Sequence, residues 1–324
     1  MPLSRRAVMG FALAAPVLVA CGTTEAARTP APGGSASASG GGVTATDSRG
    51  VTVTLAQPAT KVVTLEWGPT EDVLALGVTP VAVADPTGFA SWDSAVTLPA
   101  GTADVGLRTE PSLESIAKAA PDLILGVTGS IPEAALAQAE KIAPVFLLKA
   151  ADASRPLEQM RENFTTTAKL LGKEAAATPI LAALDAKLAE GKQKLAGVTS
   201  PYIFTYINVT GATADLRMHS DRSLPGAVAK AVGLTNAWTD AGDPAWGIGS
   251  IDLEGLTKFP ADTTVLYWAN ASADPLATLK GNALWEGLPF VKDGRVKPAA
   301  DRIWIYGGPS SMIQWIDDLV AKLA

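Results

Sequence analysis

Cysteine and histidine are almost absent from this chain of 324 residues, which contains one of each, Cys21 and His219. A single cysteine cannot form an internal disulfide. Manganese and zinc sites need a cluster of histidines with carboxylate or thiolate ligands, so one histidine nearly excludes that class of binder. The chain also lacks a G-x-S-x-G elbow and a phosphate-binding loop, which removes the usual signatures of hydrolases and nucleotide-binding enzymes.

Positive charge is in the minority, with 26 Lys and Arg against 32 Asp and Glu and a net charge of −6. Residues 1–20 contain Arg5 and Arg6 but no acidic residue, so their removal makes the remaining chain more acidic. Nucleic-acid binding depends on clustered positive charge that neutralises phosphates. The balance of charge therefore argues against nucleic acid as a partner.

Long apolar runs are missing except at the start, where Arg5 and Arg6 precede the run Ala7–Ala20. This run is too short to span a bilayer comfortably and contains Pro16, so residues 1–20 are interpreted as a cleaved signal peptide. Residues 18–21, LVAC, resemble the bacterial lipobox, and we expect Cys21 to be lipidated and to anchor an extracytoplasmic protein to the cell membrane. The arginine pair resembles a twin-arginine signal, but the general secretory route stays open.

Residues 21–46 follow as a segment rich in Gly, Ser, Ala and Pro with almost no large apolar side chains. Such a composition cannot bury enough surface to offset the entropy of ordering, so we expect a disordered tether between the lipidated cysteine and a globular body. The remaining residues are numerous enough for two lobes of ordinary size.

The body alternates short apolar runs with helical patterns, which predicts an α/β fold with largely parallel sheets. We expect an N-terminal α/β lobe over 47–172, a connecting helix over 173–197 and a C-terminal α/β lobe over 198–324. Its helical pattern, roughly Glu174–Leu195, would form a helix about 33 Å long at 1.5 Å per residue and would be the stiff link between them. Two lobes joined in this way imply a cleft. Residues 111–125 and 250–266 also share a pattern of short helix, proline and buried strand, as if both lobes were built on one unit.

Three segments make the pattern specific. They are KVVTLEWGPTEDVLALGVTPVAVAD, GLRTEPSLESIAKAAPDLILG and LWEGLPFVKDGRVKPAADRIWIYGGPSSMIQWIDDL. They resemble the ferric-siderophore-binding proteins of ABC importers, and within that family the ferric-hydroxamate binders, over nearly all of residues 47–324. The resemblance implies two Rossmann-like lobes, one rigid connecting helix and a shallow aromatic ligand cleft between the lobes.

A ferric hydroxamate has its iron wrapped by ligand oxygens, so its binder needs flat apolar walls and a donor instead of metal ligands. The family's ligand-contacting arginine corresponds to Arg108, whose forked guanidinium can donate to two hydroxamate oxygens at once. A surface pair with Glu110 is the competing interpretation of Arg108. The resemblance further places Trp246, Trp304 and Tyr306 in the cleft.

Trp67 and Trp92 are expected as further wall residues, and Trp238, Trp268, Trp285 and Trp315 as packing residues. Residues 304 and 306 would share one face if they lie in a strand. Simple packing is the competing role for every tryptophan. The loop after the DLIL strand, residues 126–130, carries Gly-Val-Thr-Gly-Ser where hydroxamate binders have a tyrosine, so one contact is expected to be lost.

In this family one acidic residue on each lobe docks into the permease, and the matching positions are Glu114 and Glu254. Their place in a first helical turn is also favoured by the helix dipole alone. The resemblance implies a monomeric binding protein with no cofactor and no catalytic step, which takes up a ferric siderophore and delivers it to an ABC permease.

Other ligands stay open. Ferric citrate or a ferric catecholate is strongly anionic and would need more arginines, for which Arg217, Arg222 and Arg302 are available. Cobalamin is a further competitor, and bare iron would require tyrosinates from the four tyrosines of the chain. A lipid-anchored enzyme is the alternative of another class. For that alternative His219 beside Ser220 and Asp221 is a weak candidate base, and Gly247-Ile248-Gly249 is only a fragment of a dinucleotide motif.

Overall fold

The computed structural model describes residues 41–210, 213–268 and 275–324. The chain divides into Met1–Ser39 and Gly40–Ala324, and the second of these is a compact unit. The predicted signal peptide, the predicted lipidation site Cys21 and most of the predicted tether lie outside the described residues. None of the helices in the described stretches has both the length and the apolar character needed to cross a membrane.

The compact unit begins with a hairpin. Strand β1 (Val43–Thr46) pairs antiparallel with β2 (Thr52–Leu55), and its Val43 is buried opposite Leu55. The prediction of disorder through residue 46 is therefore wrong for its last four residues. Alternating apolar side chains give the hairpin one face that packs on the core of the first sheet.

The first sheet is parallel throughout, with strand order β5-β4-β3-β8-β9. Its strands are β3 (Val62–Thr64), β4 (Ala82–Val83), β5 (Ala103–Asp104), β8 (Leu123–Val127) and β9 (Val145–Leu148). Successive side chains of a strand point to opposite faces, so Val62 joins one apolar cluster and Val63 the other. Burial on both faces explains the continuous apolar runs in the sequence.

Five helices accompany this sheet, and a small antiparallel hairpin leads into one of them. The helices are α1 (Trp67–Ala75), α2 (Pro86–Trp92), α3 (Leu113–Ala119), α4 (Glu133–Ala139) and α5 (Pro156–Leu170). The hairpin strands, β6 (Gly106–Leu107) and β7 (Glu110–Pro111), leave Arg108 and Thr109 at the turn between them. The hairpin therefore presents Arg108 away from the sheet.

The second sheet is mixed, with strand order β12-β11-β10-β13-β14. Its strands are β10 (Tyr202–Thr210), β11 (Thr213–His219), β12 (Ile248–Asp252), β13 (Thr264–Trp268) and β14 (Val296–Pro298). β10 is parallel to β13, but β11 and β12 join by antiparallel pairing, so the expectation of largely parallel sheets holds only for the first sheet. Short elements around it are α7 (Leu224–Ala231), the 3-10 helix η1 (Glu254–Lys258), α8 (Pro275–Leu279), α9 (Ala283–Gly287) and α10 (Pro289–Lys292).

The internal similarity seen in the sequence corresponds to equivalent positions in the two sheets. Residues 111–125 form α3 and β8, and residues 250–266 form η1 and β13. β8 and β13 each lie beside the middle strand of their sheet and run parallel to it. The two domains thus share this part of their construction.

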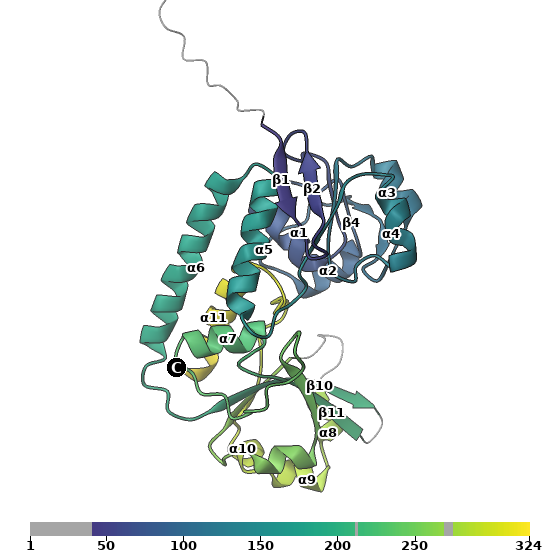
Figure 1. Cartoon of the computed structure of the whole chain (residues 1–324). Coiled ribbons are helices and arrows are strands. Elements are labelled where there is room, and N and C mark those ends of the chain that lie inside the picture. The colour runs from purple at the N-terminus through teal and green to yellow at the C-terminus, as the bar shows by residue number, and fades with distance from the viewer. Residues whose placement is uncertain (1–40, 211–212, 269–274) are drawn as a thin grey trace, which may run out of the picture. The chain divides into compact units, whose positions relative to one another are not determined.

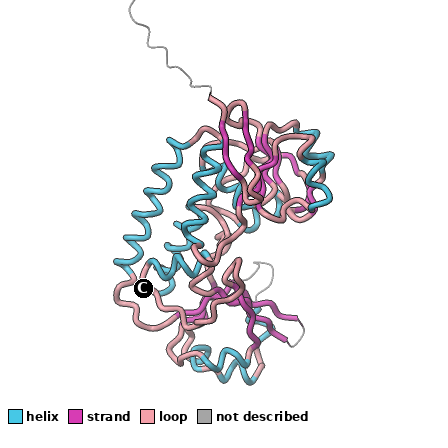
Figure 2. The backbone as a smooth tube through the Cα atoms, in the orientation of Figure 1, coloured by secondary structure: helices cyan, strands magenta, loops and turns pink. Residues whose placement is uncertain are grey.

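A long helix, α6 (Glu174–Lys194), runs between the two sheet-containing domains (Figure 1). It does not stand alone, because α5 and α11 (Pro309–Leu323) pack on it, and α11 also contacts α1 and α7. Figure 2 shows these helices gathered beside the strands of both domains. The helix predicted for this region is present, while its role as the single rigid connector stays a prediction.

Candidate functional site

Two adjoining cavities have walls from both domains. The larger, of about 540 Å³, is lined by Glu66, Arg108 and Ser130 of the first domain and by Arg217 and Trp246 of the second. The smaller, of about 280 Å³, shares Arg108 and Arg217 with it. Trp304 and Tyr306 line both cavities. A ligand-sized cleft therefore lies where the sequence predicted one.

Arg108 reaches the cleft from the turn of the β6–β7 hairpin. Its Nη1 donates to both carboxylate oxygens of Glu66, at 2.7 and 2.8 Å, and its guanidinium carbon lies 3.9 Å from the centre of the Trp67 ring. Glu66 is the residue before α1 and also accepts from the Trp67 N–H. The partner of Arg108 is thus Glu66 and not Glu110. Neither Nε nor Nη2 has a hydrogen-bond partner among the described residues, and Arg108 lines both cavities of the cleft.

A chain of edge-to-face aromatic contacts forms one wall. The ring centroids of Trp67 and Trp304 are 4.8 Å apart, those of Trp304 and Tyr306 5.2 Å, and those of Tyr306 and Trp246 5.3 Å. Such geometry is favourable for aromatic pairs and holds each ring in place. Trp246, with 38% of its surface exposed, is the open end of this wall.

Trp92 belongs to a second branch of the aromatic wall. Its ring lies 4.8 Å from Trp268, which in turn lies 6.1 Å from both Trp304 and Tyr206. All four line the smaller cavity. The assignment of Trp268 to packing is therefore incomplete, and Tyr206 was not foreseen. Trp268 is the last residue of β13, and Tyr206 of β10 is its partner in the last parallel pair of these two strands. α/β proteins commonly bind ligands at the carboxyl ends of parallel strands.

The segment with Trp304 and Tyr306 is a loop between β14 and α11, not a strand. A turn hydrogen bond joins the Gly307 N–H to the Trp304 carbonyl at 2.8 Å. The two side chains nevertheless line the same cavity, as expected. The remaining tryptophans, Trp238, Trp285 and Trp315, are buried in apolar clusters, in agreement with a packing role.

Tyr306 contacts His219, the last residue of β11 in the second domain. The Tyr306 hydroxyl and His219 Nε2 are 3.1 Å apart. Burial, and then the charge of Arg217, lower the pKa of His219 to about 3, so this imidazole is neutral. Ser220 Oγ donates to the carbonyls of Ala241 and Gly247. His219 is thus a buried structural partner of Tyr306, and this arrangement offers no activated serine.

Arg217 enters the cleft from β11, where the alternation that buries Leu216 and Met218 turns it outward. None of the ion pairs found between described residues includes Arg217, so its charge is available in the cleft. Arg222 donates to the Ala153 carbonyl and Arg302 to the Asp93 carbonyl, and neither lines the two cavities of the cleft. Of the three additional arginines considered in the sequence analysis, Arg217 is therefore the one that lines the same cavities as Arg108.

Asp243 shapes the turn that presents Trp246. Its carboxylate accepts the N–H groups of Ala245, Trp246 and Ile248. Burial acts to raise the pKa of Asp243, but these hydrogen bonds outweigh it and the pKa is lowered. The carboxylate is therefore ionised and engaged. Of the segment 126–130, which lacks the expected tyrosine, residues 127–130 line the same cavity as Asp243, and Ser130 Oγ accepts the Val127 N–H.

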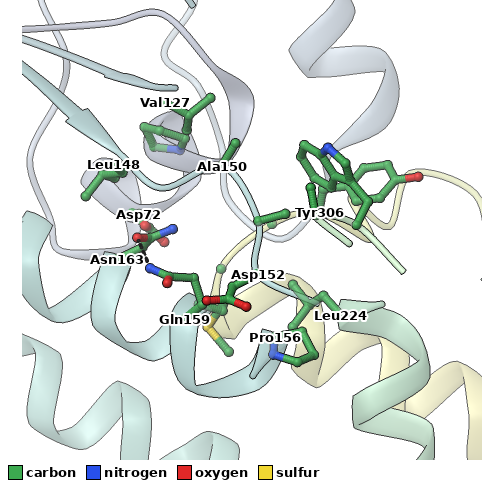
Figure 3. A pocket seen from close by; sticks show the side chains of 18 of the residues that line it. Asp72, Val127, Leu148, Ala150, Asp152, Pro156, Gln159, Asn163, Leu224 and Tyr306 are labelled. Atoms are coloured by element: carbon green, nitrogen blue, oxygen red, sulfur yellow. Dashed lines mark hydrogen bonds between the residues drawn. The ribbon is translucent and has the colours of Figure 1, made fainter. Parts of the chain in front are cut away.

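A small polar chamber of about 70 Å³ lies beside the cleft and shares Tyr306 and Trp246 with it (Figure 3). Gln159 Nε2 donates to Asn163 Oδ1 at 3.0 Å, and the buried Asp72 lies close to this pair in the figure. Asp72 Oδ1 has no hydrogen-bond partner within the described part of the chain. The chamber has room for little more than water.

Glu114 and Glu254 are both exposed, Glu114 in the first turn of α3 and Glu254 at the start of η1. Each belongs to a different domain, and neither takes part in an ion pair between described residues. Across the described stretches no group of three or more His, Cys, Asp or Glu side chains could hold a metal ion. The cleft is accordingly built from aromatic rings and guanidinium groups.

Comparison with known proteins places this geometry in context. The sequence pattern of a family described as periplasmic binding protein matches residues 62–302. The chain is 29% identical over 258 residues to the iron(3+)-hydroxamate-binding protein FhuD of Escherichia coli K12, covering 79% of this chain and 84% of that protein. It is 31% identical over 259 residues to the Fe(3+)-citrate-binding protein YfmC of Bacillus subtilis 168, with coverages of 80% and 78%.

Among solved structures, the siderophore-binding protein FhuD of Vibrio cholerae with bound Fe3+-Desferal superposes with a TM-score of 0.71. That match has 31% identity and covers 82% of this chain and 97% of that one. The resemblance inferred from the sequence motifs is thereby confirmed, as is the fold of two sheet-containing α/β domains. The chain belongs to the periplasmic binding protein family.

Proposed function

We propose that this protein captures a ferric siderophore of the hydroxamate type and delivers it to an ABC importer for iron uptake. The observation that carries the proposal is Arg108, whose guanidinium carbon lies 3.9 Å from the centre of the Trp67 ring in the aromatic cleft, with no hydrogen bond from Nε or Nη2 to the described residues. A guanidinium can donate in parallel to neighbouring oxygens of an iron-bound hydroxamate. The aromatic rings then cover the apolar parts of the complex.

The balance of charge in the cleft favours a hydroxamate over a strongly anionic ligand. Arg108 is neutralised by Glu66 at 2.7 Å, and Asp243 lines the same cavity as Arg217. A ferric citrate or catecholate complex would bring several negative charges to a site whose own charges cancel. Arg217 is the observation that favours this second candidate, because it has no ionic partner in the described structure. Cobalamin stays as a further alternative.

Delivery would use Glu114 and Glu254, one on each domain, as the contacts to the permease. Both are exposed and free of ion pairs with the described residues, which suits docking into basic pockets. The proposed protein acts as a monomer, needs no cofactor and carries out no covalent step. Trp67, Trp92, Trp246, Trp304 and Tyr306 would act as ligand-covering walls only.

The start of the chain supports a lipid-anchored location. Arg5, Arg6 and the apolar run that follows suit a signal peptide, and Cys21 would receive the lipid after cleavage. Fractionation of cells that produce the wild type and Cys21→Ala tests this. Membrane association that persists in the variant would contradict the proposed anchor.

Tryptophan fluorescence titration tests the ligand. The chain from Gly40 onward is the suitable protein, because it keeps the β1–β2 hairpin and forms a compact unit. We expect saturable quenching by ferrioxamine or ferrichrome, weakened at least about tenfold in Arg108→Ala and in Trp304→Ala. Quenching by ferric citrate, a ferric catecholate or cobalamin alone would replace the proposed ligand. No response to any of them would contradict the proposed function.

A further inference from the structure

Glu71 is a fully buried carboxylate in the middle of α1, and its hydrogen bonds go to the other end of the chain. Its Oε2 accepts from the Gly308 N–H at 3.0 Å and from Ser311 Oγ at 2.7 Å. Its Oε1 accepts from the Ser311 N–H at 2.9 Å. One side chain of the first domain thus receives three hydrogen bonds from the beginning of α11.

These bonds replace a cap that α11 lacks. The first N–H groups of a helix have no partner inside the helix, and the aligned peptide dipoles favour negative charge there. The N-cap residue of α11 is Gly308, which has no side chain to supply an acceptor. Glu71 therefore serves as the cap from another helix.

Positions 307 and 308 are both glycine, and a larger residue at either position would collide with a carboxyl group of α1. A Cβ atom on Gly307 would lie 2.1 Å from Glu71 Oε2, and a Cβ on Gly308 would lie 2.2 Å from Asp72 Oδ1. Either approach is closer than real Cβ contacts allow. The pair Gly307-Gly308 thus lets two carboxyl groups of α1 reach the backbone at the start of α11.

The contact joins the two chain segments that carry Trp67 and Trp304. Glu71 is on the helix that begins with Trp67, and it binds the residues that follow Trp304 and Tyr306. A second tie holds the same loop, since Arg302 Nη2 donates to the Asp93 carbonyl at 3.1 Å. In return, the Ser94 N–H and Oγ donate to the Arg302 carbonyl. The loop 302–308 is therefore fastened to the first domain at both ends.

The charges around Glu71 are almost all negative. Burial, followed by the nearby carboxyl groups of Asp93 and Asp72, raises the pKa of Glu71 well above its ordinary value, against the hydrogen bonds from Ser311. Burial likewise raises the pKa of Asp93 to about 6, opposed by hydrogen bonds and by Arg302. Because these carboxyl groups repel each other when both are ionised, a proton bound by one of them is favoured at this site.

We propose that Glu71 is a positioning residue of the cleft. By capping α11 it sets the spacing of the Trp67 and Trp304 rings, over which the Arg108 guanidinium lies at 3.9 and 5.6 Å from the ring centres. Its effect on ligand affinity rests on the proposed siderophore-binding function, whereas its effect on the spacing of the rings does not. Glu71 itself lines neither cavity of the cleft and acts through the loop 302–308.

Glu71→Gln is the decisive variant, because it keeps the size of the side chain but turns one acceptor into an NH₂ group that faces a donor. The first measurement uses the protein without ligand. A tryptophan pair 4.8 Å apart gives an exciton signal in circular dichroism, and Trp67→Phe identifies the part that this pair contributes. We expect Glu71→Gln to lose most of that part, and Ser311→Ala, which removes one of the three bonds, to lose some of it.

The matched control is Asn282→Ala, which removes an ordinary cap from α9, where Asn282 Oδ1 accepts from Leu284 and Trp285. It should keep the full exciton signal. The second measurement is ferrioxamine affinity, expected to fall at least about tenfold in Glu71→Gln and to be unchanged in Asn282→Ala.

A native exciton signal in folded Glu71→Gln would overturn the proposal. If that variant does not fold, an unchanged signal in Ser311→Ala would overturn it instead. Should the wild type bind no siderophore at all, the function would fail while the exciton measurement still decides the role of Glu71.

Discussion

The guanidinium carbon of Arg108 lies 3.9 Å from the centre of the Trp67 ring. A cation in this position is attracted to the face of the ring. Only Nη1 is engaged by a carboxylate, that of Glu66. Arg108 is therefore both oriented and partly neutralised before any ligand arrives, and Glu66 competes with the ligand for it.

Glu66→Gln should change which ligands the cleft accepts. The substitution removes the negative charge beside Arg108 but leaves a polar side chain of the same length. We expect affinity for anionic ferric citrate to rise about tenfold, and affinity for a neutral ferric hydroxamate to change by less than about threefold. Fluorescence titration of both ligands measures this difference.

Glu110→Gln provides the control, because it makes the same change of charge two residues from Arg108, at an exposed site. It should leave both affinities unchanged. Equal gains from the two variants would mean that general charge, and not the Arg108–Glu66 pair, governs selection.

Arg217→Gln should act in the opposite sense. Arg217 is exposed in the cleft without an ionic partner among the described residues, so its charge is available to an anionic ligand. We expect affinity for ferric citrate or a ferric catecholate to fall about tenfold, roughly 1.4 kcal/mol, with a smaller loss for ferrioxamine. A larger loss for ferrioxamine would show that Arg217 contacts the hydroxamate itself.

The sequence motifs placed Trp67 and Arg108 at the cleft, and both line its smaller cavity, while their roles in ligand binding stay a prediction. Trp67 and Arg108 stand at the ends of short elements with clear patterns, and the structure places them in contact. Trp268 was harder to assign, because the run TVLYW is typical of a buried core strand. Trp268 is distinguished from the other residues of this strand only by its position at the carboxyl end. The role of such a residue depends on where the strand ends relative to the cleft.

Glu71 could not have been found from sequence. A glutamate within a helix is usually solvated, and the composition of GPTEDV gives no other indication. Its partner Ser311 is 240 positions away, so the contact exists only once both domains are folded. The same contact joins α1 to the residues that follow Tyr306, so the structure of the Trp304–Tyr306 loop also depends on contacts between distant parts of the chain.

Asp93 should make stability depend on pH. Its pKa is raised to about 6 from an ordinary value of 3.8, chiefly by burial. The folded state therefore holds a proton that the unfolded chain releases, and the stability gained from it is complete below about pH 4 and is lost as pH rises through about 6. Asp93→Asn supplies a side chain that is neutral at every pH. Its NH₂ group is a hydrogen-bond donor, as the protonated carboxyl group of Asp93 is.

We accordingly expect Asp93→Asn to become more stable relative to the wild type as pH rises, by up to about 3 kcal/mol between about pH 4 and about pH 8. Denaturant unfolding at several pH values measures the difference. His219, whose pKa is lowered to about 3 by burial, destabilises both proteins equally on acidification and cancels in the comparison. A difference in stability that is constant with pH would mean that Asp93 carries no proton in the folded state.

Glu114 and Glu254 should matter for transport and not for ligand binding. We expect Glu114→Lys and Glu254→Lys, singly or together, to keep native ferrioxamine affinity, because neither residue lines the cleft. If the proposed docking into basic pockets of the permease is right, uptake of the siderophore by cells should be lost in the double variant, because like charges would then meet.

Reversing a charge in a first helical turn also lowers the stability of the fold by up to about 1 kcal/mol through the helix dipole. The effect on uptake therefore needs a control in which the same change is made in the first turn of other helices. Glu133→Lys and Glu174→Lys make that change in the first turns of α4 and α6, where both residues are exposed. Their double variant should transport normally. If it loses uptake as well, lost stability would explain the result, whereas loss confined to Glu114 and Glu254 would support a permease contact on each domain.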